Sequence, residues 1–229
     1  MKFFNSHVML ILITILLLYS YFINFAHPKL EVRQYSDLKH KFKTGDIILF
    51  HGLDNINSLI LGYYSHIGLV YVDDNTKQKY LFEAFNPKRM PYFNNFVRSG
   101  IAMTPLKERL TTFRGYCFYK ELVDPIKKKS DINNLNTFIN YAKRNMFYNP
   151  NVLSCGIKRI LCNTPLTNAT NCAELIYICL IKLGLLSQNK IKKNNFHHLY
   201  YLSNLTKTDN GNEYKHPQFI LSNYFENAQ

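Results

Sequence analysis

Cys172 is the residue whose type and position most clearly suggest chemistry. Asn171 is a favourable helix N-cap residue and Glu174 stands three positions later, which makes an Asn variant of the capping box. This pattern predicts that Cys172 lies in the first turn of a helix. There, unsatisfied backbone N–H groups and the positive end of the helix dipole favour the nucleophilic thiolate over the thiol. A lone cysteine is more often a small buried hydrophobic residue, so catalysis also requires a partner.

His66 and Glu83 supply that partner. Two runs rich in β-formers flank a turn cluster and predict a hairpin: residues 65–72 and 79–85. If the turn is centred near Asp74 and Asn75, residues whose numbers sum to about 149 face one another, so His66 lies opposite Glu83. A carboxylate beside an imidazole fixes its tautomer and orients it as a base toward a nucleophile. The alternative is a half-buried strand histidine with an exposed glutamate in a surface salt link.

Two neighbouring residues bear on this choice. Gly68 interrupts the apolar strand close to His66, and a glycine within a strand often marks the close approach of another backbone or of a ligand. His51 follows the apolar run 47–50 and is the alternative base if the register of the strands differs. Gly68 favours the functional interpretation of His66.

The order of the elements predicts an α+β fold with an antiparallel sheet packed on helices. Short strand patterns come first, at residues 47–50, 65–72, 79–85, 101–103 and 116–119. After Asp124-Pro125 the pattern changes, because residues 131–144 carry apolar side chains at helical spacing and a second helix runs from Asn171 to Gly184. Strands followed by helices are typical of this class.

Four short motifs, in this order, resemble the circularly permuted NlpC/P60 group of the papain-like superfamily. They are Gly45-Asp46-Ile47-Ile48, Ser65-His66-Ile67-Gly68-Leu69-Val70, Phe82-Glu83-Ala84 and Asn171-Cys172-Ala173-Glu174-Leu175-Ile176. That group includes bacterial YiiX/YaeF-type proteins, a poxviral branch and, more distantly, lecithin:retinol acyltransferase. Its histidine precedes its cysteine along the chain, as here. The Asn-Cys-Ala-Glu sequence favours the YiiX-like branch over the acyltransferases, which carry Asn-Cys-Glu-His.

The resemblance implies a role for each matching residue. Cys172 would be the nucleophile, His66 the general base, Glu83 the residue that orients it, and Tyr148 a tyrosine that lines the substrate cleft. The expected activity is hydrolysis of an amide bond by a thiol amidase or peptidase, through a thioester and without a metal or other cofactor. The alternatives are a lipid acyl hydrolase or acyltransferase on the same fold, or a non-catalytic membrane-tethered binding protein.

An apolar stretch near the N-terminus predicts a membrane anchor. Residues 8–25 form an apolar stretch of 18 residues without a charge, at the lower limit for spanning about 30 Å of hydrocarbon. A cleaved signal peptide is the main alternative. Lys and Arg are in excess after the stretch, which by the positive-inside rule predicts that the large C-terminal part lies in the cytosol. The protein would then cross the membrane once. The predicted organisation is an anchor at 1–28, a basic linker at 29–44, the catalytic domain at 45–186 and a C-terminal extension of uncertain structure at 187–229.

Composition narrows the function further. The 229 residues are 47% hydrophobic and 19% charged, which excludes a disordered chain and leaves room for one domain with an appendage. The net charge of +13 suits an anionic partner such as a membrane surface. The Lys clusters at 127–129 and 190–193 are separate and lack interleaved aromatic residues, so nucleic acid is not expected as a partner. The five cysteines make no CxxC pair, which favours reduced thiols.

Overall fold

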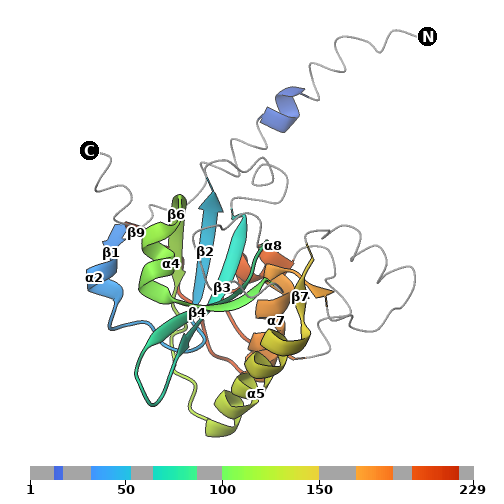
Figure 1. Ribbon diagram of the computed structural model, residues 1–229. Coiled ribbons are helices and arrows are strands. Elements are labelled where there is room, and N and C mark those ends of the chain that lie inside the picture. Colours follow the sequence, from blue (N-terminus) through green and yellow to red (C-terminus); the bar gives the residue numbers. More distant parts are fainter. Residues whose placement is uncertain are drawn as a thin grey trace, which may run out of the picture.

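A seven-stranded sheet forms the centre of the fold (Figure 1). The structure, a computed structural model, describes residues 13–17, 32–52, 64–86, 100–149, 169–187 and 198–221. The sheet has the order β1-β9-β6-β2-β3-β4-β5. Its strands are β1 (Val32–Gln34), β2 (Ile47–Gly52), β3 (His66–Val72), β4 (Lys79–Ala84), β5 (Ile101–Pro105), β6 (Gly115–Lys120) and β9 (Gln218–Leu221). The helices beside it are α2 (Tyr35–Leu38), α4 (Leu106–Thr112), α5 (Lys129–Asn145), α7 (Cys172–Lys182) and α8 (His198–Asn204).

The α+β class is confirmed, but the expectation of a purely antiparallel sheet is wrong. Strand β1 pairs in parallel with β9, whereas the other neighbours in this sheet are antiparallel. A short pair, β7 (Phe147–Tyr148) with β8 (Ala169–Thr170), is also parallel. Parallel pairing needs a long connection, and here β1 and β9 come from opposite ends of the chain. No local pattern could predict this pairing.

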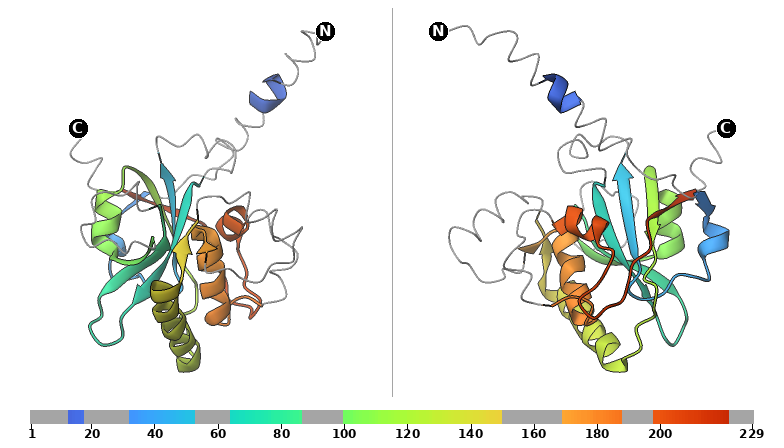
Figure 2. Two further views of the ribbon diagram at one scale, coloured as in Figure 1. Left: turned by 45° about the vertical axis from the view of Figure 1, so that its right-hand side comes forward. Right: turned by 180° about the vertical axis from the view of Figure 1, so that it is seen from behind.

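Helices cover both faces of the sheet, which explains the continuous apolar runs in its central strands. Figure 2 shows α5, α7 and α8 on one side of the sheet and α2 and α4 on the other. In β2, Ile47 and Leu49 pack in the core cluster on the α7 side, whereas Ile48 and Phe50 pack in the cluster on the α4 side. The same alternation continues in β3 and β4, so both strands are buried on both faces.

The two predicted helices after residue 124 are confirmed with small changes of boundary. Helix α5 buries Leu135, Phe138, Ile139 and Ala142, the apolar positions that the sequence places at helical spacing. Helix α7 ends at Lys182, two residues before Gly184, whose φ of +68° is the left-handed conformation that glycine adopts without strain. Helix α4 was not predicted. It is a seven-residue helix between β5 and β6, too short to show a clear apolar period.

The β3–β4 hairpin forms, but its register differs from the expected one by two residues. The paired residues have numbers that sum to 151, as in Leu69 with Phe82 and Val72 with Lys79. The turn closes between Asp73 and Gln78, where the Asp73 N–H donates to the Gln78 carbonyl, and Lys77 within it adopts a positive φ of 58°. The centre of the turn therefore lies one residue later than expected. Since side chains alternate with a period of two, a shift of two leaves His66 and Glu83 on the same face.

The sheet extends beyond the boundaries expected at residues 45 and 186. Strand β1 lies in the segment expected to be a basic linker, and Leu38 and Phe42, which follow it, are buried. Strand β9 lies in the expected C-terminal extension and pairs with β6. Segments on both sides of the four motifs therefore belong to the same folded unit.

Most of the predicted anchor lies outside the described residues. Residues 13–17 are helical, with Ile13, Ile15, Leu16 and Leu17 each about half to two-thirds exposed. Among the described residues, no helix has both the length and the apolar character needed to cross a membrane.

Candidate active site

Cys172 is the first residue of α7, as the capping pattern predicts. The Asn171 side chain accepts a hydrogen bond from the Glu174 N–H at 2.9 Å, so the N-cap is formed. Short strand β8 leads directly into this cap. The cysteine is half-buried, and its side chain packs at the border of the core cluster on the α7 side. The helix start therefore places the thiol next to the sheet and within reach of solvent.

His66 and Glu83 meet at the point where β3 and β4 separate. The ladder between these strands ends at Leu69 and Phe82, and beyond it Glu83 pairs with Ala102 of β5. His66 pairs with Phe50 of β2 on the other side. The His66 Nε2 lies 2.7 Å from the Glu83 Oε2, although the two are diagonal rather than opposite. The carboxylate has no exposed surface and the imidazole is 15% exposed.

Gly68 lacks a side chain at a point where the Leu81 side chain packs against the backbone of β3. A Cβ atom at Gly68 would lie 2.7 to 2.8 Å from three carbon atoms of the Leu81 side chain. Real Cβ atoms do not approach that closely. In the structure, the glycine at position 68 is therefore explained by close packing of the Leu81 side chain.

The imidazole of His66 also interacts with Cys172. The Cys172 side chain lies close enough to the ring to raise the pKa of His66, through its charge and through hydrogen bonding. Because the Nε2 faces Glu83, the Nδ1 is the ring nitrogen left for the sulfur. Glu83 lies with residues of the α4 side, whereas Cys172 belongs to the α7 side. His66 bridges the two layers, since its place at the beginning of β3, beside the gap to β4, gives it access to both.

Arg109 is a site residue that the sequence analysis missed. Its Nε donates to Glu83 Oε1 at 2.7 Å and its Nη2 donates to Oε2 at 3.2 Å. The guanidinium is 2% exposed and stacks over the rings of Phe50 at 4.6 Å and Phe113 at 5.2 Å. The residue lies on α4, which was not predicted. The one feature of the sequence that could have pointed to Arg109 is its place between the apolar residues Leu106 and Leu110.

The charges of this cluster are coupled. Burial alone would raise the pKa of Glu83, but the Arg109 charge and the hydrogen bond from His66 outweigh it and hold that pKa at about 2. Burial alone would lower the pKa of His66, but the interactions with Cys172 and then with Glu83 outweigh it and raise that pKa to about 9. The structure therefore favours an imidazolium held between a carboxylate and the sulfur.

Tyr148 and His51, the other two candidate residues, lie on strands β7 and β2. Tyr148 is half-buried in β7, opposite Thr170 of β8, which is two residues before Cys172. Tyr148 therefore lies beside the short strand that leads into α7. His51 stacks on Tyr116, with ring centroids 6.0 Å apart, and follows the β2 residue that pairs with His66. It is His66, not His51, that contacts Glu83.

The remaining described thiols differ from Cys172. Cys117 and Cys179 are buried, and burial raises the pKa of Cys117 to about 12. Cys155 and Cys162 lie outside the described residues. Within the described part of the chain, no group of three or more His, Cys, Asp or Glu side chains could hold a metal ion.

Comparisons with known proteins give no family assignment for this chain. Neither the family models nor the curated proteins searched contain a match.

Proposed function

We propose that the chain is a thiol hydrolase that cleaves an amide bond, with Cys172 as nucleophile, His66 as general acid and base, and Glu83 as the residue that orients His66. The observation that carries the proposal is an imidazole that is hydrogen-bonded to a buried carboxylate and whose pKa is raised by a nearby helix-terminal thiol. A cysteine, a histidine and a carboxylate are the residue types that covalent catalysis by a cysteine uses, which supports the proposal. The proposal includes a permuted NlpC/P60-like fold and a membrane anchor at residues 8–25.

The proposed reaction has two steps. The Cys172 thiolate attacks the substrate carbonyl and forms a C–S bond, while first-turn N–H groups of α7, which lack partners within the helix, stabilise the oxyanion. The imidazolium of His66 gives its proton to the leaving amine as the C–N bond breaks, and a thioester remains. Water then attacks the thioester and gives its proton to His66. The C–S bond breaks, which releases the carboxylic acid and restores the thiolate–imidazolium pair.

The first test is whether Cys172 becomes acylated. The full chain in detergent is mixed with p-nitrophenyl acetate, and the acetylated residue is located by peptide mass spectrometry. Acetylation is expected at Cys172 and not at the buried Cys117 or Cys179, which serve as internal controls. His66→Gln is expected to slow the reaction by about a hundredfold or more, because a positioned acid and base contributes about 10²–10⁴. Equal rates in the two proteins, or no acetyl thioester at Cys172, would overturn the proposal.

The second test identifies the substrate bond. Panels of acyl-aminocoumarin amides and of phospholipid esters are offered to the wild type and to Cys172→Ala. Turnover of amides that disappears in Cys172→Ala supports the amidase. Turnover of phospholipid esters alone would replace it with the lipid acyl hydrolase.

A further inference from the structure

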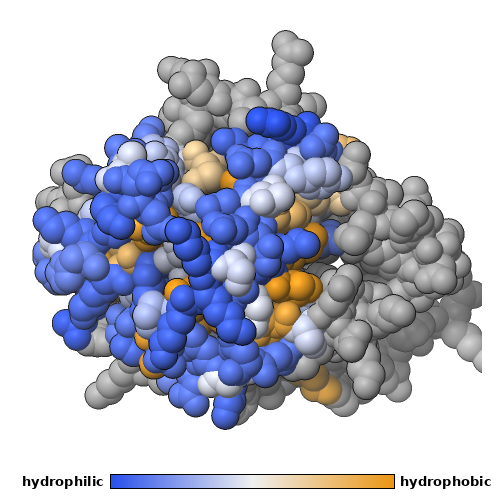
Figure 3. Space-filling view, turned by 90° about the horizontal axis from the view of Figure 1, so that it is seen from below, coloured by the Kyte–Doolittle hydropathy of each residue, from blue (hydrophilic) through white to orange (hydrophobic). Residues whose placement is uncertain are grey.

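An open pocket of about 530 Å³ lies between α2, the β3–β4 turn and the beginning of α4. Lys39 and His40 enter it from the end of α2, Lys77 and Lys79 from the hairpin, and Lys107 from α4. Three segments that are distant in sequence thus supply cationic groups to one concavity. Figure 3 shows that the end of the molecule seen from below, where the hairpin turns, is largely hydrophilic.

We propose that this pocket, defined here as the basic pocket, binds a ligand that carries two or more phosphate groups. Four lysines line the pocket and no Asp or Glu is among its lining residues. Four lysines around one concavity give it a positive potential, which attracts an anion. The nearby carboxylates of Asp37 and Glu108 are exposed and lie outside the lining.

The basic pocket is built on fixed elements. The Lys79 ammonium donates to the carbonyl oxygen of Lys39 at 2.5 Å, which ties the hairpin to the end of α2. Leu106, also in the lining, is fully buried and anchors the first turn of α4 in the core cluster on that side. Lys39, Lys77 and Lys107 are exposed around this frame, so their ammonium groups can reach a bound anion.

Phosphate is the anion that best fits these groups. Lysine binds phosphate as a compact point charge, whereas planar carboxylates are better recognised by the fork of arginine. Several ammonium groups match the several charges of a diphosphate, and one carboxylate would leave most of them unpaired. A single concavity also suits a compact polyanion better than a nucleic-acid strand, which needs a longer groove.

The basic pocket is separate from the Cys172 site. His66 begins β3 and the pocket lies at the turn after its last residue, so the seven-residue strand holds them about 20 Å apart. The phosphate groups could belong to an anionic lipid headgroup, since Lys39 follows the proposed anchor within about 15 residues, or to a soluble metabolite. The chemistry is shared, and the experiment distinguishes the two sources.

The test uses the full chain in phosphatidylcholine nanodiscs, titrated with inorganic pyrophosphate by calorimetry. A triple variant, Lys39→Gln with Lys77→Gln and Lys107→Gln, removes three charges from the pocket. The matched control, Lys127→Gln with Lys128→Gln and Lys129→Gln, removes three exposed charges elsewhere. We expect the pocket variant to raise the Kd about tenfold or more and the control to change it less than about twofold.

The source of the phosphate is tested by lysine acetylation with a water-soluble ester. Protection of Lys77 and Lys107 by pyrophosphate but not by nanodiscs that contain phosphatidylinositol bisphosphate indicates a soluble ligand, and protection in those nanodiscs indicates a lipid headgroup. Lys127 to Lys129 should stay reactive in both. No protection by either probe, or an equal loss of binding in the two triple variants, would overturn the proposal. Neither result depends on the activity of Cys172.

Discussion

At the scale of single residues, the candidate site depends on how one buried carboxylate is kept ionised. Glu83 accepts hydrogen bonds from His66 and twice from Arg109, with Thr104 as a weaker fourth donor at 3.5 Å. A buried carboxylate with only a histidine partner could take the proton from the imidazole and lose its orienting charge. The guanidinium prevents this, because it stabilises the ionised form permanently. Arg109 is thus a positioning residue that acts on His66 through Glu83.

Replacing Arg109 is expected to destabilise the fold strongly. Arg109→Met leaves the Glu83 charge buried with too few partners, so the free energy of unfolding should fall by about 3–5 kcal/mol in urea denaturation. Lys107→Met, an exposed change on the same helix, should have an effect below about 0.5 kcal/mol. Adding Glu83→Gln to Arg109→Met should restore part of the loss. A double variant less stable than Arg109→Met would contradict this account of the pair.

At the scale of elements, the sequence predicted those parts of the site that depend on local patterns. The N-cap of α7 and the shared face of His66 and Glu83 follow from short signals, namely Asn171 before the helix and the parity of a hairpin. The register could not be predicted exactly, because it depends on how the turn at residues 73–78 closes. Arg109 could not be predicted at all, because its partner is 26 residues away and its helix has no periodic signature.

The N-cap of α7 offers a test of how the helix start positions the thiol. Asn171→Ala removes the acceptor for the Glu174 N–H, so the free energy of unfolding should fall by about 1 kcal/mol. Alkylation of Cys172 by iodoacetamide should also slow, because a frayed first turn no longer holds the sulfur against His66. Asn171→Ser keeps an acceptor at the cap and should preserve both properties. Unchanged alkylation in Asn171→Ala would separate the cap from the reactivity of the thiol.

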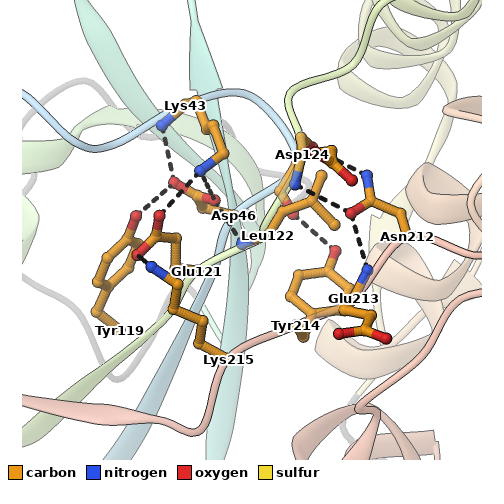
Figure 4. Close-up of polar contacts among 11 residues, drawn as sticks. Lys43, Asp46, Tyr119, Glu121, Leu122, Asp124, Asn212, Glu213, Tyr214 and Lys215 are labelled. Carbon is orange, nitrogen blue, oxygen red and sulfur yellow. Dashed lines mark hydrogen bonds and ion pairs between the residues drawn. The ribbon is translucent and has the colours of Figure 1, made fainter.

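At the scale of the whole molecule, the C-terminal segment closes the fold over the beginning of β2. Tyr214 donates its hydroxyl hydrogen bond to the carbonyl oxygen of Gly45 at 2.8 Å, next to the buried Asp46 (Figure 4). Asp46 accepts hydrogen bonds from the Tyr119 hydroxyl and from the Leu122 N–H, each at 2.9 Å. The Gly45-Asp46 motif is thus a structural junction that joins the beginning of β2 to the end of β6 and to the segment before β9.

The buried ionisable groups predict how the stability of the whole chain varies with pH. The folded pKa of Glu83 is lowered to about 2, so its contribution is present above about pH 4.5 and is lost as the pH falls toward 2. Burial raises the pKa of Asp46 to about 7, so this group favours folding when protonated and its contribution declines as the pH rises from about 4 to 7. The pKa of His66 is raised to about 9, so its contribution is present below about pH 6.5 and is lost as the pH rises through 9.

These three directions place maximum stability in the mildly acidic range and predict a decline from about pH 6.5 to 8 that His66 controls; above pH 8 the buried Lys120, whose pKa is lowered to about 8, opposes it. One bound proton changes the free energy of unfolding by at most about 1.4 kcal/mol per pH unit, which urea denaturation resolves. In His66→Gln the decline above pH 6.5 should flatten. In Asp46→Asn that decline should remain while the slope between about pH 4 and 7 becomes smaller. Parallel curves for the wild type and His66→Gln would mean that His66 holds no extra proton in the folded state, and the imidazolium between Glu83 and Cys172 would then have to be abandoned.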